Sequence, residues 1–466
     1  MEDEQGLLEK ARRFENKIGN CAKNNENILI VSHHDADGIC AAAILSEFIY
    51  RNNGHSQVRT VSEPNSKFLD RLSSSKFDLI IFVDICSGLS EDISKRFGDK
   101  WLIIDHHEIP DSELEQESIL NPAQFGIDGT SSLSSSTLCY LVTKTFQERV
   151  SFLSVVGAIG DRQDVGPRRS LVGLNAKALG TENQEFKGID SKFDLLFSSR
   201  ETKPVHESIA GTLTIFIPGL TGNKDACLAS LRGAGIEIKA STRWKTLADF
   251  SEEEKQKLLE VIVPHLSGTT YTVEDLVGSV YSLNSRDEFS ITRDARDLAV
   301  ILSVCGRMGK AGVAVSLCLG DESLLSTEVE QIMSDYRIEI TRSILSLIQS
   351  EDRISEKGDY AIIMGDGIVG ERMTGAVCQI ISSYSRFRSK VVFVRTTTQD
   401  GDVKISARCG KERQDVNLAN MMRKIAKETS GVGGGLKNAA GLRFSIAKQQ
   451  EFQQAVGLLF PSQRLN

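Results

Sequence analysis

The stretch "LIVSHHDADGICAAAI" (residues 29–44) places two histidines and two aspartates within five consecutive positions, between two apolar runs. The run before them has the length and composition of a buried strand, and the Ala-rich run after them predicts a helix over 38–51. Polar residues that directly follow a strand of an open parallel sheet lie at its carboxyl end, where ligands bind. The stretch therefore predicts a ligand site at the end of the first strand.

The same alternation continues to residue 107. Helix-like stretches over 66–73 and 90–97 separate further short apolar runs, which are "VRTVS" (58–62), "DLIIFVDI" (78–85) and "WLIID" (101–105). Strands that alternate with helices in this way indicate βαβ units around a parallel sheet, so the fold class is α/β. The charged N-terminal stretch has apolar residues at helical spacing and predicts an amphipathic helix, not a signal peptide.

A second α/β unit begins near residue 355. Its strands are predicted at "YAIIMGDG" (360–367), "KVVFVRT" (390–396) and "VKISARC" (403–409), with helices near 371–383 and 416–428, and a glycine-rich segment follows. Between the two units, "SEEE" (251–254) is a capping-box pattern that opens a helix.

Composition excludes several classes of protein. The net charge of −8 argues against a generally basic surface that coats duplex DNA. Nine cysteines without a CxxC pair indicate reduced, buried thiols in a cytoplasmic protein, without disulfides or structural zinc. No apolar run approaches membrane-spanning length, so we expect no membrane association.

Four of the seven histidines form two pairs, and both pairs follow predicted strands. Carboxylates accompany them, and the set comprises His33, Asp35, Asp37, Asp84, Asp105, His106, His107 and Asp161. So many neighbouring carboxylates repel one another unless cations hold them ionised. Imidazole and carboxylate without thiolate favour Mn²⁺ or Mg²⁺ over structural zinc. Two ions that share a carboxylate are typical of displacement at phosphorus, so the set predicts phosphoester hydrolysis.

Each element alone has a simpler interpretation. A single aspartate after a strand is usually a helix N-cap, and an isolated histidine pair usually lies on the surface or in a satisfied core position. The ordered set of H-x-D-x-D-G, then VD, then DHH, then a helix that ends in GD favours the functional interpretation.

These motifs resemble those of the DHH phosphoesterase superfamily, in its RecJ-like single-strand exonuclease branch. "SHHDADG" (32–38), "FVDIC" (82–86), "DHH" (105–107) and "GAIGD" (157–161) are similar to its four motifs in order. "GGGLKNAAG" (433–441) resembles the glycine-rich loop of the associated DHHA1 domain.

The resemblance implies a parallel-sheet catalytic domain and a smaller α/β DHHA1 domain that face each other across a cleft. It implies one metal ion on His33, Asp35 and Asp84, and a second on Asp37, Asp84, His106 and Asp161. Asp84 would bridge the two ions. His107 would contact the scissile phosphate, and Asp105 would orient the neighbouring imidazoles.

In the DHHA1 domain, the resemblance implies that Arg408 binds a phosphate and that the amides of Gly433, Gly434 and Gly435 form an anion-binding loop. The family loop usually ends in histidine, but Leu436 stands at that position here. This departure removes a donor from the substrate grip, and Lys437 is the candidate replacement.

The middle segment contains "VCGRMGKAG" (304–312) and resembles archaeal RecJ-like proteins that associate with the replication factor GINS. We expect three domains: a catalytic domain (1–185), a mainly helical or mixed inserted domain that binds a partner (190–345), and a DHHA1 domain (355–466). The implied location is the cytoplasm, at the nucleoid or replisome.

Three functions are compatible with these residues. The first is a metal-dependent exonuclease on single-stranded DNA or RNA, linked to replication or repair, that grips phosphates more than it stacks bases because only 6% of residues are aromatic. The second is a phosphodiesterase for short oligonucleotides or cyclic dinucleotides, and the inserted segment counts against it. The third is a GINS-binding replisome scaffold with a vestigial site, and the intact ligand set counts against it.

Overall fold

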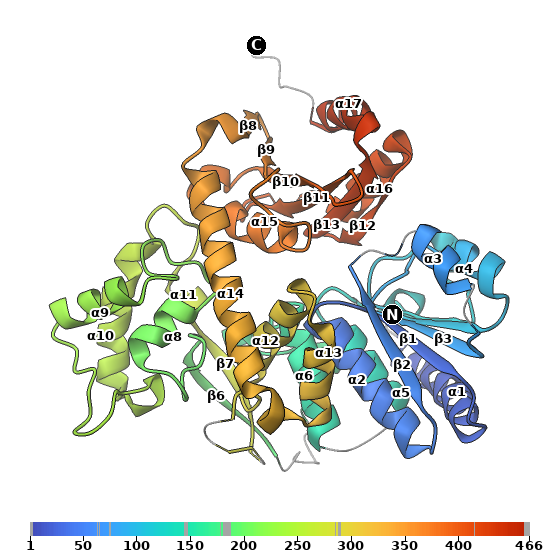
Figure 1. Cartoon of the computed structure of the whole chain (residues 1–466), viewed down its shortest axis with the longest axis horizontal. Helices are drawn as coiled ribbons and strands as arrows, with labels where there is room; N and C mark the ends of the chain where they lie inside the picture. Colours follow the sequence, from blue (N-terminus) through green and yellow to red (C-terminus); the bar gives the residue numbers. More distant parts are fainter. Residues whose placement is uncertain are drawn as a thin grey trace. The chain divides into compact units, whose positions relative to one another are not determined.

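The computed structural model describes residues 3–62, 64, 66–73, 76–143, 148–177, 179, 188–284, 286–287, 290–413 and 415–460. Contacts divide the chain into two compact units, of which the first joins residues 1–202 to residues 277–333 (Figure 1). The second joins residues 203–276 to residues 334–466. The three domain boundaries expected from the sequence stay a prediction. Among the described helices, none combines the length and the apolar character that a membrane span requires.

The first unit is built on a five-stranded sheet in the order β2-β1-β3-β4-β5, in which every pairing is parallel. The strands are β1 (Ile28–His33), β2 (Ser56–Val61), β3 (Leu79–Val83), β4 (Trp101–Ile104) and β5 (Ile119–Leu120). The parallel α/β sheet expected from the sequence is confirmed. The two-residue strand β5 was not predicted, because so short a segment has no periodicity to detect.

Helices cover both faces of this sheet, which explains why the central strands β3 and β4 are apolar and buried at every position. On one face, Leu69 and Ile93 pack against Leu29, Phe82 and Ile103 in one buried cluster. On the other face, α2 packs on β1 and on α5 and α6. The helices are α1 (Glu4–Lys23), α2 (Ala36–Arg51), α3 (Ser66–Ser73), α4 (Ser90–Phe97), α5 (Ser135–Thr143), α6 (Glu148–Gly160) and α7 (Gly173–Lys177).

The later part of the first unit packs directly against the helices of the sheet. It contains the antiparallel pair β6 (Ile189–Leu195) and β7 (Val277–Leu283), and the helices α12 (Ala295–Arg307) and α13 (Ala311–Leu319). Helix α12 contacts α2 and α6, and it approaches the loop after β1 so closely that a Cβ atom on Gly306 would lie 1.6 Å from the carbonyl oxygen of His34. The Ala36 amide donates to Ser303 Oγ at 3.2 Å. Helix α12 therefore supports the loop that carries the first histidine pair.

The second unit contains a six-stranded sheet in the order β12-β13-β11-β10-β9-β8. Only β9 and β10 pair in parallel, and the other neighbours are antiparallel. The strands are β8 (Ile354–Lys357), β9 (Tyr360–Met364), β10 (Val391–Thr397), β11 (Asp402–Cys409), β12 (Val432–Leu436) and β13 (Ala439–Ser445). Helices α16 (Leu418–Thr429) and α17 (Gln449–Leu459) share a buried cluster with Phe393 and Ile405, and α15 (Thr374–Ser382) contacts β10 and β11.

The middle region of this unit is helical, as the sequence predicted. It consists of α8 (Val205–Gly211), α9 (Lys224–Gly233), α10 (Glu252–Ile262) and α11 (Val273–Leu276), and the end of α14 (Glu322–Ile348) belongs to the same unit. The predicted capping box is confirmed, since the Ser251 amide donates to Glu254 Oε2 at 2.9 Å and the Glu254 amide donates to Ser251 Oγ at 3.3 Å.

Candidate metal centre

The first histidine pair lies where β1 ends and α2 begins. His33 is the last residue of β1, and Asp35 is the N-cap of α2, where its Oδ1 accepts from the Gly38 amide at 3.2 Å. Asp37 lies in the first turn of α2 and is fully buried. Carboxylates near a helix N-terminus interact favourably with the helix dipole, so the local fold favours acidic residues here.

Asp84 follows β3 in a left-handed conformation, with φ of 61°, and its side chain is buried. A non-glycine residue in this region carries strain that the surrounding structure must hold. Glu113 holds the loop after Asp84, because its two carboxylate oxygens accept from the amides of Gly88 (2.8 Å) and Ser90 (2.9 Å). Asp105 Oδ2 accepts a further hydrogen bond in this loop, from the Ser87 amide at 3.0 Å.

The second histidine pair follows β4. His106 is buried, and its Nδ1 donates to the carbonyl oxygen of Gly129 at 2.6 Å, which leaves Nε2 as the ligand nitrogen. That Nε2 lies 2.8 Å from Asp161 Oδ2 and 3.3 Å from Asp84 Oδ1. His107 Nδ1 bonds instead to Asp105 Oδ1 at 2.7 Å.

Ligand atoms of these residues form three overlapping groups, and the atoms within each group lie within 4.8 Å of one another. Asp84 belongs to all three groups. The groups are His33, Asp35 and Asp84; Asp37, Asp84, His106 and Asp161; and Asp84, His106 and His107. The first two coincide with the ligand sets expected from the sequence, whose role in binding metal stays a prediction.

Neighbouring charges shift the pKa values of the histidines. Burial opposes protonation of His33 and His106, but adjacent carboxylates outweigh burial and raise both pKa values well above the ordinary value. For His33 these carboxylates are Asp35 and Asp84, and for His106 they are Asp161 and Asp84.

The carboxyl groups divide into two classes. Burial and the nearby charges of Asp161 and Asp84 raise the pKa of Asp37 well above its ordinary value, and burial also raises that of Asp161. Burial has the same tendency at Asp105, but the imidazole of His107 outweighs it and holds the pKa of Asp105 well below its usual range. Asp105 is therefore an ionised partner for His107, whereas Asp37 and Asp161 lack enough positive charge nearby.

The donor set fits two divalent cations. It consists of imidazole nitrogens and carboxylate oxygens, which suit Mn²⁺ and Mg²⁺. Three of its buried atoms, His33 Nδ1, Asp84 Oδ2 and His106 Nε2, make no well-formed hydrogen bond in the described part of the chain, although each lies within ion-pair distance of another member of the donor set. Buried polar atoms without well-formed hydrogen bonds are costly, and cations shared through Asp84 would satisfy all three.

Four polar residues support the ligands and were not predicted from the sequence. The amides of Ser135 and Ser136 donate to the two oxygens of Asp37 at 2.7 and 3.0 Å, and Ser135 Oγ donates to Asp84 Oδ1 at 3.1 Å. Gln163 Nε2 donates to the Gly129 carbonyl at 3.0 Å, and Asn175 Nδ2 donates to Gln163 Oε1 at 2.6 Å. The serine-rich run "TSSLSSST" (130–137) is a signal in the sequence that could have drawn attention to Ser135 and Ser136. Nothing in the sequence marked Gln163 or Asn175.

The predicted substrate-binding residues of the second unit lie at one end of its sheet. The register places Arg408, Ala439 and Leu436 side by side across β11, β13 and β12. Arg408 Nε donates to Gln379 Oε1 at 3.1 Å. Gly433, Gly434 and Gly435 do not form a loop, because they are part of the edge strand β12, and the exposed Lys437 begins the turn after it. An edge strand still presents amides on its open side, so their proposed role with anions is retained.

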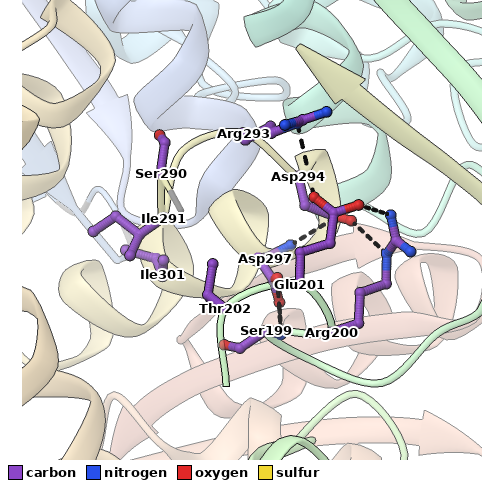
Figure 2. Close-up of a pocket in the computed structure, with 10 residues that line it drawn as sticks. All are labelled: Ser199, Arg200, Glu201, Thr202, Ser290, Ile291, Arg293, Asp294, Asp297 and Ile301. Carbon is purple, nitrogen blue, oxygen red and sulfur yellow. Dashed lines mark hydrogen bonds and ion pairs between the residues drawn. The ribbon is translucent and has the colours of Figure 1, made fainter. Parts of the chain in front are cut away.

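A small pocket lies elsewhere in the first unit (Figure 2). Its described lining includes none of the predicted site residues. Arg200 is buried beside it and pairs with Asp194, Glu201 and Asp294 at 2.9, 2.6 and 3.2 Å. Both oxygens of Asp297 accept from the Ser199 amide at 2.8 Å (Figure 2). The charge of Arg200 is paired within the protein and Asp297 is held by the Ser199 amide, which indicates a structural role for both.

Comparison with protein-family models gives the class of the protein. Residues 27–156 match the DHH family N-terminal domain, residues 196–277 match the DHH-CID domain, and residues 359–460 match the DHHA1 domain. The fold and the motif residues agree with this set of domains. By these three domains the chain belongs to the DHH superfamily, and its fold is similar to that of RecJ.

Among individual proteins, an uncharacterized protein of Methanocaldococcus jannaschii is 28% identical over 439 residues, which are 92% of each chain. CDC45 from Entamoeba histolytica has a similar fold, with a TM-score of 0.61 and 13% identity over 98% of this chain and 99% of that one. RecJ from Thermus thermophilus, in complex with Mn²⁺, gives a TM-score of 0.55 and 16% identity, and the match covers 97% of this chain and 55% of that one.

Proposed function

We propose that this protein is a metal-dependent phosphodiesterase that degrades single-stranded DNA or RNA from an end. The observation that carries the proposal is the pair of ligand groups that share Asp84 in a buried position at the carboxyl ends of β1, β3 and β4. A solved structure of "exonuclease RecJ bound to manganese" supports the proposal, because its fold is similar to that of this chain, with a TM-score of 0.53 and 16% identity.

In this proposal, His33, Asp35 and Asp84 hold one ion, and Asp37, Asp84, His106 and Asp161 hold the other. Two divalent ions that share a carboxylate activate water and neutralise the charge that develops during in-line displacement at phosphorus. The chain keeps its ligands aimed at the ions through neighbouring donors. The Gly129 carbonyl fixes the tautomer of His106, and the amides of Ser135 and Ser136 fix the plane of Asp37.

His107 is the residue proposed to contact the scissile phosphate. Burial lowers its pKa, but the ionised Asp105 outweighs burial and raises it, so the imidazole carries a positive charge more readily than usual. Because Nδ1 is bonded to Asp105, Nε2 is the nitrogen that donates to a phosphate oxygen. Asp105 orients that imidazole and does not itself bind substrate.

The second unit is proposed to hold the strand through its backbone phosphates. Arg408 provides a planar donor, the amides of Gly433, Gly434 and Gly435 provide neutral donors, and Lys437 adds charge at the turn where family members carry histidine. We propose Mn²⁺ as the preferred ion, with Mg²⁺ as the alternative, and a cytoplasmic location at the nucleoid or replisome.

The test is degradation of end-labelled single-stranded DNA and RNA, with Mn²⁺ or with Mg²⁺, by the intact protein and by an Asp84→Asn variant. We expect ladders that need metal and that Asp84→Asn loses by at least about 1,000-fold, since Asp84 serves both ions. Asp92→Asn, on the exposed surface of α4, is the matched control and should digest normally. Intact polymer in every metal condition would refute the proposal.

The CDC45-like fold supports a second candidate, a replisome scaffold that binds GINS through the middle region. The two candidates make different predictions for the Asp84→Asn variant. A scaffold would bind GINS equally well with or without Asp84 and would show no cleavage. The short-substrate alternative predicts cleavage of dinucleotides while longer strands stay intact.

A further inference from the structure

The segment that follows the ligand Asp161 carries three arginines in the left-handed backbone conformation. Their φ angles are 59° for Arg162, 56° for Arg168 and 56° for Arg169. This conformation is uncommon outside glycine, asparagine and aspartate, and strained residues that persist concentrate at functional sites. The segment from 162 to 170 is called the arginine turn below.

The arginine turn is fastened to the first unit by several bonds. The Gly166 amide donates to the Ser170 carbonyl at 2.9 Å, and Ser279 Oγ on β7 donates to the Arg168 carbonyl at 3.1 Å. Arg169 Nε donates to the buried Asp164 at 3.0 Å. These contacts fix the backbone at Arg168 and pair the side chain of Arg169 with Asp164. The Arg168 guanidinium takes part in none of them.

That guanidinium lies over an exposed aromatic ring. The Arg168 Cζ atom is 5.1 Å from the centroid of Phe193 on β6, and Phe193 is 51% exposed. Arg168 is exposed and makes no ion pair within the described ranges, whereas neighbouring Lys192 lies 3.6 Å from both Asp194 and Glu201. Val165, in the same turn, is 60% exposed. The exposed Phe193 ring and the Arg168 cation therefore differ from the neighbouring Lys192, whose charge lies close to two carboxylates.

We propose that Arg168 and Phe193 form a stacking platform for a base of the single strand whose phosphodiester lies in the metal centre. Aromatic rings bind any nucleobase by stacking, and an adjacent arginine adds a cation for the ring face or for a phosphate. The inference rests on the proposed function. It adds base stacking to the phosphate contacts, which the low aromatic content of the sequence had favoured as the main mode of binding. A neutral or cationic partner would gain nothing from the unpaired guanidinium.

The position of the platform along the chain limits how far it lies from the chemistry. Arg168 lies seven positions after Asp161, so the two lie within about 25 Å even if the segment were fully extended. A stacked strand covers that span in fewer than about eight nucleotides. A strand of about eight nucleotides is therefore long enough to reach the platform from the metal centre, and in this proposal a dinucleotide held at the metal centre is too short to do so.

The first experiment compares substrates by length. KM is measured for a dinucleotide and for a 12-nucleotide single strand with the intact protein, Phe193→Ala, Phe193→Tyr and Arg168→Gln. We expect Phe193→Ala to raise KM for the 12-mer about 5- to 150-fold, the loss of one stacked base, and to leave the dinucleotide unchanged. Phe193→Tyr should restore the intact value, and Tyr50→Ala, which removes an aromatic residue that is 78% exposed, is the control.

The second experiment detects contact without any turnover. In a Phe193→Trp variant, a 12-mer single strand added in the absence of metal should quench the fluorescence of the new tryptophan. An abasic 12-mer should quench it much less. Equal KM values for Phe193→Ala and intact protein at both lengths, or equal quenching by abasic and normal strands, would overturn the platform. If the intact protein cleaves nothing, the proposed function fails, while the quenching still reports whether a base contacts residue 193.

Discussion

The ligands of the metal centre have pKa values that link metal binding to pH. His33, His106, Asp37 and Asp161 all have raised pKa values, so at neutral pH the metal-free protein binds more protons at these groups than free side chains would. A cation requires them deprotonated. Metal binding must therefore release protons, and affinity must rise with pH.

We expect Mn²⁺ affinity to increase about tenfold per pH unit for each proton released, between about pH 6 and 8. Calorimetry in buffers with different ionisation enthalpies measures the number of protons directly. An affinity that is constant over this range, with no proton release, would show that the ligands are already deprotonated in the metal-free protein.

Gln163 and Asn175 are positioning residues for the ligand His106. Gln163 is fully buried between the Gly129 carbonyl, which accepts from His106, and Asn175. Gln163→Leu should lower Mn²⁺ affinity about 10- to 100-fold, the usual cost of losing a residue that orients a ligand. Binding by calorimetry and near-UV circular dichroism separate this effect from unfolding, and Gln5→Leu on the surface of α1 is the control. Unchanged affinity with a native spectrum would contradict the assigned role.

At the scale of elements, the sequence predicted the strands and helices of the first sheet because burial on both faces leaves continuous apolar runs. It did not predict that Gly433, Gly434 and Gly435 form an edge strand, since glycine runs are typical of loops and this strand depends on pairing with β13. The sequence also did not reveal that α12 supports the loop that carries the first histidine pair. Gly306 is small because His34 lies against it, and that contact joins residues 272 positions apart.

The N-terminus of α12 provides a test of stability at this scale. Burial and the neighbouring Asp294 raise the pKa of Asp297 to about 8, although the Ser199 amide and Arg200 oppose the shift. A carboxyl whose pKa is higher in the folded state binds its proton more tightly there, so it stabilises the fold below about pH 4 and loses that contribution as pH rises through about 8.

We therefore expect the urea midpoint of the intact protein to fall between about pH 6 and 9 by more than that of Asp297→Asn, which keeps an acceptor for Ser199 and cannot ionise. Glu201 and Asp294 face the same group and are present in both proteins, so the difference isolates Asp297. Parallel midpoints in the two proteins would show that Asp297 is ionised throughout.

For the whole molecule, the predicted ligands come together because their motifs lie at strand ends, a position that the sequence pattern reveals. Their supporting residues come from distant segments, and no local pattern links Asn175 to Gln163 and His106. The same limit applies to Phe193, whose contact with Arg168 depends on how β6 and the arginine turn pack on β7. Local periodicity predicts what one segment does, whereas these contacts depend on tertiary structure.

The net charge of −8 shapes how the whole molecule meets a polyanion. Most of the surface repels a nucleic acid, so binding must use a few local cations and should weaken steeply with salt. Each phosphate contact to a single strand contributes about −0.7 to the slope of log K against log salt. Replacing a cation that binds a phosphate should therefore reduce the magnitude of that slope by about 0.7.

Arg408→Gln should weaken binding of a 12-mer single strand and reduce the slope in this way, as measured by fluorescence anisotropy between about 50 and 300 mM salt. Arg13→Gln, on the exposed face of α1, should leave both quantities unchanged. A uniform loss of affinity without a change in slope would mean that Arg408 acts through Gln379 and the fold of the sheet instead of through a phosphate. That result would move the phosphate contacts to Lys437 and the open edge of β12, where the Lys437→Gln variant applies the same criterion.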